Sequence, residues 1–275
     1  MVMEQRIAHN RLSGKIALVT GATQGVGADV ARELAIAGAE KVFVVGLGKQ
    51  AAEEVAASLG EAGVAIEADI TDDAALARCV QTALDQAGCI DILINGAAAY
   101  DDAGLASTRE QWLSTLNVNL ISAAILTQLV VPHMPKGGVV VNIGSVGGKF
   151  GAAGRAIYPA SKAALLQLTK NLAVTLAPSG IRVLSVSPGW TWSPMLSHMS
   201  QGSMARADQV GGALHPLGRV GRGEEVGRAV VFAVSDAASW MTGTDLAVDG
   251  GFSCLGPDQG MSARHWFEQV STEGQ

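Results

Sequence analysis

A short apolar strand that runs directly into a glycine-rich turn and a helix constrains the fold of this chain more than any other feature. The strand is predicted over Lys15–Thr20, and the turn that follows, Gly21–Gly27, has the spacing G-x-x-x-G-x-G. Apolar residues then recur at helical spacing up to Ala37. In such a unit, the backbone N–H groups of the turn and the helix N-terminus can receive a phosphate. For these glycines alone, a turn that binds nothing remains the alternative.

The alternation of strands and helices continues along the chain. Further strands are predicted at 41–45, 64–68, 90–94, 138–143, 181–186 and 244–248. Helices are predicted at 50–59, after a cap at Thr71 or Asp72, and at 108–131, 155–176 and 224–234. This order predicts an α/β fold, a doubly wound parallel sheet of about seven strands with helices on both faces. No linker or repeat divides the chain, so residues 1–275 are expected to form one domain with a loose lead-in at 1–12.

The composition narrows the class of protein and its partners. Hydrophobic residues make up 48% and charged residues 16%, which suits a globular protein, and 34 glycines favour close packing of helices on a sheet. A net charge of −6 without a basic run argues against nucleic acid and anionic membranes. Three cysteines and five scattered histidines show no metal-ligand spacing, so we expect no metal site, reduced thiols and a cytoplasmic location. We also expect no signal peptide and no membrane span, which needs roughly 18 apolar residues.

A tyrosine and a lysine follow the predicted fifth strand on one helix. Tyr158 and Lys162 are four residues apart, so their side chains lie on the same helix face. Ser145 stands at the end of the preceding strand. An ammonium beside a phenol is expected to lower the pKa of the phenol from about 10, which would suit a proton donor and acceptor near neutral pH. Alone, the spacing Y-x-x-x-K also occurs by chance on exposed helix faces.

Over about residues 13–252 the ordered motifs resemble the short-chain dehydrogenase/reductase family, in its single-domain branch. The motifs are Thr20-Gly21-x-x-x-Gly25-x-Gly27, Asp69, Asn95, Asn119, Ser145, Tyr158-x-x-x-Lys162, Pro188-Gly189, Pro216-Leu217-Gly218-Arg219 and Thr242-Gly243 to Asp249-Gly250-Gly251. The resemblance implies an NAD(P)-dependent enzyme that interconverts a secondary alcohol and a ketone by hydride transfer.

Two other functions are alternatives to this oxidoreductase activity. The first is a 3-oxoacyl thioester reductase acting on a carrier protein, against which the acidic net charge and a tryptophan-rich lid argue. The second, from another class, is a nucleotide-binding regulator without turnover. Such regulators commonly lose the tyrosine or the lysine, and this chain retains both Tyr158 and Lys162.

The resemblance also assigns catalytic roles to four residues. Tyr158 would be the acid/base, and Lys162 would lower its pKa and hold the nicotinamide ribose hydroxyls. Ser145 would bind the reacting oxygen, and Asn119 would hold a water in a proton relay behind the lysine. The alternatives are an ordinary strand-end hydroxyl for Ser145 and a surface amide for Asn119.

A nucleotide site at the carboxyl edge of the sheet is implied in the same way. The expected cofactor-binding residues are Gly21, Thr23, Gln24, Gly25, Val26, Gly27, Gly46, Leu47, Asp69, Ile70, Asn95, Gly96, Ala97, Tyr158, Lys162, Pro188, Gly189, Thr191 and Ser193. Asp69 as a turn residue and Ser193 as a helix cap are the alternatives. Asn95-Gly96-Ala97-Ala98 departs from the family's Asn-Asn-Ala-Gly, and Gly144 replaces a common second serine, a change expected to matter little.

The end of the second strand bears on the choice between NAD and NADP. The family usually has an acid there for NAD, or an arginine one position on for NADP. This chain has Gly46 and Leu47, and Gln24 is neutral where NADP users often have a basic residue. Lys49 is either close enough to meet a 2′-phosphate or a solvated surface lysine. Without an arginine clamp, we favour NAD(H).

A segment rich in methionine and tryptophan, 190–214, is expected to form a lid over the substrate. The expected pocket residues are Ala98, Tyr100, Val146, Phe150, Trp190, Trp192, Met195 and Met199. Adaptable apolar side chains favour an apolar or cyclic ketone or alcohol. The alternative is that half of these residues pack on the protein itself.

The tail, 252–275, has apolar residues of its own: Leu255, Met261, Trp266, Phe267 and Val270. We expect the tail to pack over a pocket or across a subunit interface. The family resemblance implies a homodimer or homotetramer built through the helices at 108–131 and 155–176.

Overall fold

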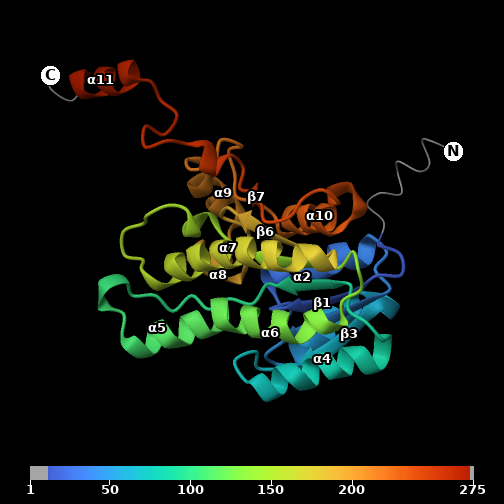
Figure 1. The fold of residues 1–275 in the computed structure, drawn as a ribbon. Helices are drawn as coiled ribbons and strands as arrows, with labels where there is room; N and C mark the ends of the chain where they lie inside the picture. Colours follow the sequence, from blue (N-terminus) through green and yellow to red (C-terminus); the bar gives the residue numbers. More distant parts are fainter. Residues whose placement is uncertain (1–11, 273–275) are drawn as a thin grey trace.

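The computed structural model describes residues 12–272 and has a seven-stranded parallel sheet at its centre (Figure 1). The strand order is β3-β2-β1-β4-β5-β6-β7. The strands are β1 Ile16–Thr20, β2 Lys41–Gly46, β3 Gly63–Glu67, β4 Ile92–Asn95, β5 Val139–Ile143, β6 Arg182–Pro188 and β7 Asp245–Val248. The predicted doubly wound parallel sheet is confirmed.

Helices cover both faces of this sheet. The α-helices of residues 12–272 are α2 Gly25–Ile36, α3 Lys49–Ser58, α4 Asp73–Ala87, α5 Arg109–Leu116, α6 Ser122–Val130, α7 Ile157–Leu176, α8 Pro194–Met199, α9 Met204–Gly212, α10 Gly223–Val234 and α11 Ala263–Thr272; α8, α9 and α11 do not cover the sheet. One hydrophobic core joins the sheet to α2, α3 and α10, and a second joins it to α4, α6 and α7. Side chains alternate between the two cores along each strand, so Val44 faces one and Phe43 faces the other. Asp72 caps α4, as one of the two predicted alternatives.

The chain reverses its winding direction between β1 and β4, both of which lie in the middle of the sheet. β1 pairs with β2 on one side and with β4 on the other, so that Thr20 lies beside both Val45 and Asn95. The helices that follow β1 and β4 therefore lie on opposite faces of the sheet. In open α/β sheets, the crevice that this opens at the carboxyl edge is the place where ligands bind.

The helix predicted as regular over 108–131 is interrupted. Thr108 caps α5, a π-helical turn occupies Asn117–Ile121, and α6 then continues the helix. A π turn holds an extra residue, which turns the side chains that follow, and such turns are frequent at functional sites. By length and composition alone, residues 109–133 could cross a membrane. Leu126 and Val130 are buried against the sheet, so this is a core helix of the domain.

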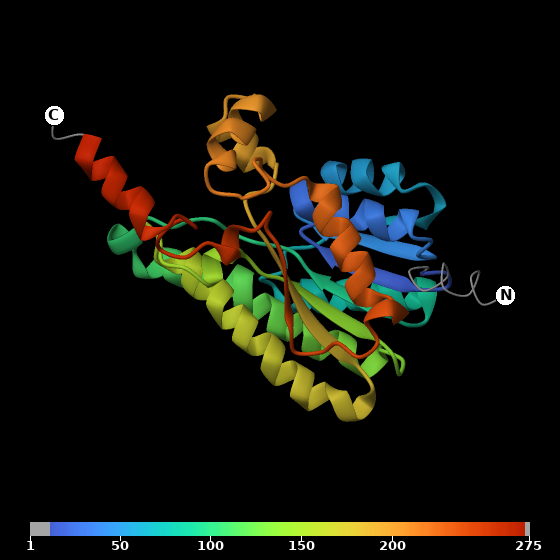
Figure 2. The same cartoon turned by 90° about the horizontal axis from the view of Figure 1, so that it is seen from above.

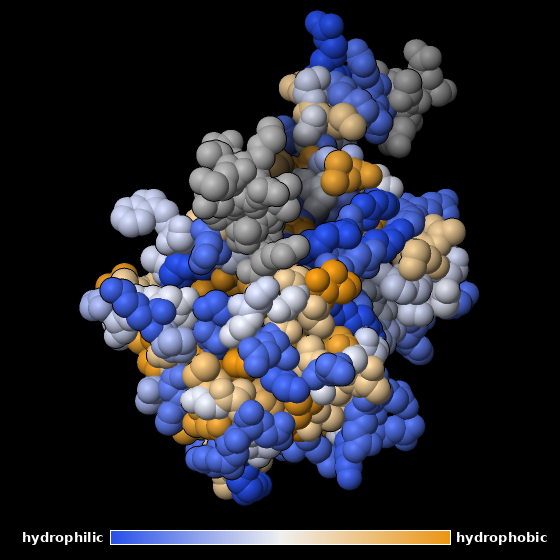
Figure 3. Space-filling view, turned by 90° about the vertical axis from the view of Figure 1, so that its right-hand side faces the viewer, coloured by the Kyte–Doolittle hydropathy of each residue, from blue (hydrophilic) through white to orange (hydrophobic). Residues whose placement is uncertain are grey.

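The lid segment and the tail lie outside the layers. Helices α8 and α9 stand together beside the sheet, and α11 projects away from the body in both ribbon views (Figures 1 and 2). On α11 and just before it, Phe267 is 77% exposed and Met261 46%. On the face drawn in Figure 3, hydrophilic and hydrophobic residues are interspersed. The tail's predicted packing across a subunit interface stays a prediction.

Candidate active site

Strand β5 and helix α7 bring Ser145, Tyr158 and Lys162 together. Ser145 follows the end of β5, and its hydroxyl accepts the N–H of Gly147 at 3.0 Å. Lys162 is 2% exposed, and its Nζ donates to the carbonyl of Ile143 at 2.8 Å. The same Nζ lies 5.8 Å from the centre of the Tyr158 ring. Lys162 therefore links the N-terminal part of α7 to the end of β5, next to the ring of Tyr158.

The expected fall in the pKa of Tyr158 is not found. Burial raises the pKa of this phenol above its usual value, and the neighbouring Tyr100 raises it further, while a hydrogen bond with Ser145 and the charge of Arg155 oppose this only in part. Burial also lowers the pKa of Lys162 to about 8. The prediction considered only the attraction between phenolate and ammonium. Removing both groups from water disfavours each charged form, and here desolvation is the larger effect.

Two side chains close around the Tyr158 ring from the solvent side. The ring of Tyr100 stacks on it with centroids 4.9 Å apart and planes inclined by 23°. The guanidinium carbon of Arg155 lies 5.8 Å from the same centroid. Arg155 is exposed, and none of the ion pairs among the described residues involves it. The guanidinium of Arg155 and the ring of Tyr100 thus border the side from which a substrate would approach the phenol of Tyr158.

Asp102 holds the start of the catalytic helix, which the sequence analysis missed. Its carboxylate accepts the N–H of Ala156 at 2.9 Å and that of Tyr158 at 3.0 Å. Burial raises the pKa of Asp102, but hydrogen bonds from backbone N–H groups outweigh this and leave the pKa below its usual value. Ala156, at the N-cap of α7, has no side chain that could serve as a cap. An acid in the loop after the fourth strand was the only signal available.

Asn119 is buried, so it is not a surface amide. The π-helical turn directs its side chain to the loop after β4, where Oδ1 accepts the N–H of Ala99 at 2.7 Å. Its Nδ2 donates to the carbonyl of Ala99 at 3.0 Å and to Ser161 Oγ at 2.9 Å. The side-chain amide is therefore occupied by protein groups and ties α7 to the loop that carries Tyr100. A relay behind Lys162 remains a proposal.

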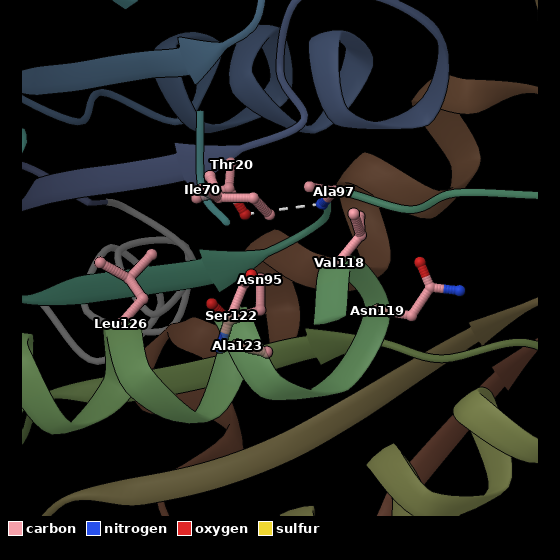
Figure 4. A pocket seen from close by; sticks show the side chains of 9 residues that line it. All are labelled: Thr20, Ile70, Asn95, Ala97, Val118, Asn119, Ser122, Ala123 and Leu126. Atoms are coloured by element: carbon pink, nitrogen blue, oxygen red, sulfur yellow. Dashed lines mark hydrogen bonds between the residues drawn. The ribbon is translucent and has the colours of Figure 1, made fainter. Parts of the chain in front are cut away.

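The glycine turn closes tightly against the loop after β4, as a phosphate cradle requires. Gly21 has a φ of +68°, and a Cβ there would lie 2.6 Å from Ala97 Cα. Thr20 Oγ1 accepts the N–H of Gly96 at 3.1 Å and holds the two loops together. Beneath them is a small cavity (Figure 4), lined by Thr20, Ile70, Asn95, Ala97, Val118, Asn119, Ser122, Ala123 and Leu126. The residues present fit a dinucleotide whose pyrophosphate rests on the N-terminus of α2.

Three of the expected cofactor residues use their side chains in hydrogen bonds within the protein. Asp69 Oδ1 accepts the N–H and the hydroxyl of Thr71, as a turn residue does. Ser193 Oγ accepts the N–H of Leu196 and caps α8. Asn95 Nδ2 donates to Asn142 Oδ1 at 2.9 Å, and Asn95 Oδ1 has no partner among the described residues. Asn95 thus joins β4 to β5 and faces the cavity with a free oxygen.

The other expected cofactor residues lie along the same edge of the sheet. They are Thr23, Gln24, Gly25, Val26 and Gly27 in the turn and α2, Gly46 and Leu47 at the end of β2, and Pro188, Gly189 and Thr191 at the end of β6. Lys49 is the surface lysine of the two alternatives, because its Nζ lies 3.8 Å from Glu53 and its side chain is 73% exposed.

The expected pocket residues differ in their exposure. Phe150, Trp190, Met195 and Met199 are exposed by 41%, 37%, 42% and 63%. Val146 is buried beside Ser145, and Ala98 lies in the loop after β4. Trp192 is half-buried and packs against the small core formed by Leu196, Ala207 and Val220, so it supports α8 and α9. Its contact with a substrate stays a prediction.

The rings of His215 and Phe252 contact two of the expected pocket residues, Trp190 and Phe150, and neither was among the residues expected from the sequence. His215 is 2% exposed, its Nδ1 lies 2.7 Å from the carbonyl of Gly211, and its Nε2 accepts the N–H of Trp190 at 3.2 Å. The ring of Phe252 meets those of His215 and Phe150, with centroids 5.5 and 5.8 Å apart. His215 therefore holds the chain that enters the lid, and a lone histidine gives no signal of such a role.

The glycine at position 144 has a steric explanation, which was not predicted from the sequence. A Cβ at this position would lie 2.5 Å from Ser187 Oγ and 2.7 Å from Ser185 Oγ. Ser187 Oγ in turn donates to Asp245 at 2.6 Å, and Asp245 pairs with Lys149. A serine at 144 would displace this polar cluster, so the departure from the family pattern matters to packing.

Comparison with known proteins agrees with this site. A family model described as enoyl-(acyl carrier protein) reductase matches residues 21–253. A cis-4-hydroxycyclohexanecarboxylate dehydrogenase from Sinomonas cyclohexanicum is 36% identical over 88% of this chain and 97% of its own length. A 3-oxoacyl-(acyl-carrier-protein) reductase from Haemophilus influenzae is 36% identical over 87% and 98%. The crystal structure of a dehydrogenase/reductase from Sinorhizobium meliloti superposes with a TM-score of 0.83 at 30% identity, over 90% of this chain and 99% of that one.

The Rossmann-type sheet and the Ser-Tyr-Lys arrangement define an oxidoreductase that uses a nicotinamide dinucleotide. The chain belongs to the short-chain dehydrogenase/reductase family. The family does not identify the substrate, because relatives of equal identity are named for a cyclic hydroxy acid and for a 3-oxoacyl thioester.

Proposed function

We propose that this enzyme interconverts a secondary alcohol and a ketone with an apolar or cyclic frame. The observation that carries this proposal is the stacked Tyr100–Tyr158 pair beside Lys162, together with the exposed aromatic side chains of Phe150 and Trp190. A flat aromatic wall beside the proton donor suits a flat or cyclic substrate.

The four catalytic residues divide the work of positioning an oxygen and moving a proton. A bound nicotinamide cofactor exchanges hydride with the substrate carbon. In reduction, Tyr158 transfers its proton to the carbonyl oxygen, and in oxidation its phenolate takes the proton of the alcohol. Ser145 donates a hydrogen bond to the same oxygen as negative charge develops there. Lys162 stabilises the phenolate that Tyr158 forms, and Asn119 holds α7 against the substrate loop.

Arg155 favours a substrate that carries an anionic group beyond its carbonyl. The guanidinium forms no ion pair among the described residues, and its central carbon lies 5.8 Å from the centroid of the Tyr158 ring. Of the relatives, the Sinomonas dehydrogenase is named for a cyclohexane that has a hydroxyl and a carboxylate. The second candidate is reduction of a 3-oxoacyl thioester, which is favoured by the equal identity to the Haemophilus reductase.

A substrate panel read by the absorbance of the reduced nicotinamide tests both candidates. We expect turnover of cyclic ketones and cyclic oxo acids, and at least tenfold lower kcat/KM on an acetoacetyl thioester. Tyr158→Phe should retain cofactor binding and lose turnover by about 10²–10⁴-fold. If the parent binds the cofactor and turns over none of these compounds, the nucleotide-binding regulator becomes the better interpretation. A preference for the thioester would establish the second candidate.

We propose NAD(H) as the cofactor and a homodimer or homotetramer as the assembly. Exposed apolar side chains on the outer faces of the helices expected at the interface support the assembly. Leu113 is 62% exposed, Ile121 48% and Val174 78%. Such residues on neighbouring helices are poorly placed in water and suit a subunit contact. Light scattering coupled to gel filtration measures the mass, and a monomer at micromolar concentration would refute this part.

A further inference from the structure

At position 46, the end of β2, a side chain would collide with the Thr23 side chain in its present position. A Cβ on Gly46 would lie 2.7 Å from Thr23 Cγ2 and 3.2 Å from Thr23 Oγ1. Thr23 belongs to the glycine turn, so the turn itself fills the place from which an acid would reach the adenosine ribose of NAD. The Thr23 side chain thus packs where a Cβ at position 46 would lie, and the lack of an acid there does not by itself favour NADP.

An acid stands on the neighbouring strand instead. Glu67 is the register partner of Gly46 in the parallel pair β2–β3, so both positions face the same side of the sheet. Its Oε1 accepts the N–H of Lys49 at 3.2 Å. Lys49 is the first residue of α3, so this carboxylate lies at the N-terminus of that helix, where an anion is stabilised. The position that a 2′-phosphate would use is thus held by the protein's own anion.

None of the ion pairs within residues 12–272 includes Glu67. The ammonium of Lys49 is directed to Glu53, at 3.8 Å. Gln24 and Leu47, which border the corner from the glycine turn and from the end of β2, are neutral, and Leu47 is 68% exposed. The corner is therefore acidic, although none of its residues occupies the position where the family's acid is found.

We propose that Glu67 makes this enzyme select NAD by excluding the 2′-phosphate of NADP. The inference rests on the proposed function only in that the dinucleotide binds at the glycine turn. A phosphate on the ribose would meet the Glu67 carboxylate at one helix terminus, and two anions there repel each other. The adenosine of NAD carries no such charge, and its ribose hydroxyls can donate to the carboxylate.

Binding measurements on the free enzyme test this directly. Dissociation constants for NADH and NADPH are measured by the fluorescence of the reduced nicotinamide, at low ionic strength because salt screens exposed charges. The variants are Glu67→Gln, which keeps an oxygen for the Lys49 N–H, and Glu67→Lys. Glu61→Gln is the matched control, since it removes an exposed acid just before β3 and outside the corner.

We expect the parent to bind NADH at least tenfold more tightly than NADPH. Glu67→Gln should reduce this ratio by about fivefold, the size of a partly screened charge interaction. Glu67→Lys should bring the ratio to one or reverse it, and Glu61→Gln should leave it unchanged. A parent that prefers NADPH, a parent that binds neither nucleotide, or Glu67 variants with an unaltered ratio would each overturn the inference. Tight NADH binding without turnover of any ketone would instead refute the proposed reaction and leave the inference standing.

Discussion

The carboxylate of Asp102 accepts the backbone N–H of the catalytic residue Tyr158, with 3.0 Å between Oδ2 and N. The same carboxylate accepts the N–H of Ala156, and two residues earlier in the chain Tyr100 stacks on the Tyr158 ring. One short loop therefore fixes the catalytic tyrosine twice, by its backbone and by its ring. Asp102 is a positioning residue, since it acts on the reaction through Tyr158.

Asp102→Ala should reduce both stability and kcat. Loss of a helix cap lowers the free energy of unfolding by about 1 kcal/mol. Without the cap, the N-terminus of α7 should hold Tyr158 less accurately, which should lower kcat about tenfold and change KM little. Because the folded-state pKa of Asp102 is depressed, its contribution is present above the unfolded value of about 3.9 and is lost as the pH falls through the folded value. Urea unfolding at pH 7 and pH 3 measures this dependence.

Asp102→Asn is the conservative variant, because an amide oxygen still accepts the N–H groups of α7. It should recover most of the kcat and remove the acid dependence of stability. Equal kcat in Asp102→Ala and the parent would show that the cap contributes to folding alone.

Lys162→Met should separate stability from activity. Burial lowers the pKa of Lys162 to about 8, so the folded state holds fewer protons than the unfolded state between about pH 8 and 10.4. The stability of the parent should therefore rise across this window relative to Lys162→Met, which has no charge to bury. The turnover of Lys162→Met should be at least about 100-fold lower. Unfolding midpoints at pH 7 and pH 9.5 test this, and a parallel pH dependence in the two proteins would contradict it.

Gly144→Ser, the residue common in the family, should destabilise this chain. Its Cβ would meet the hydroxyls of Ser185 and Ser187, and overpacking of this kind costs about 1–3 kcal/mol. The double change Ser185→Ala and Ser187→Ala should relieve the contact and restore much of the loss. Gly151→Ser, where a Cβ meets nothing within 4 Å, is the control. A melting temperature equal to that of the parent would refute the steric reason.

Arg155→Ala should discriminate between charged and neutral substrates. For a cyclic oxo acid we expect kcat/KM to fall about tenfold, equivalent to about 1.4 kcal/mol, with Arg155→Lys between the two. For the neutral cyclic ketone the change should stay within about twofold, since only the anion interacts with the guanidinium. An equal loss on both substrates would mean that Arg155 acts on Tyr158 and does not bind the substrate.

Much of the fold and of the central site was predictable, because both depend on local patterns. Runs such as Val139–Ile143, bounded by glycines and followed by amphipathic helices, can be satisfied only as buried parallel strands. Tyr158 and Lys162 share a helix face whatever surrounds them. The interruption of the helix at Asn117–Ile121 was not predictable, because a π turn is stabilised by what its side chains meet across the fold, here Ala99 and Ser161.

The sequence by itself determined the doubly wound sheet, the glycine turn, and the placing of serine, tyrosine and lysine at one edge, since strand and helix periodicities and short spacings encode these locally. Only the tertiary structure decided the direction of the Tyr158 pKa, the cap that Asp102 places on α7, the packing of Trp192 on the core of Leu196, Ala207 and Val220, and the acid that Glu67 supplies beside Gly46. Each of these depends on burial or on a partner far away in the chain. Desolvation and long-range contact are properties of the folded arrangement and leave no periodic trace in the sequence.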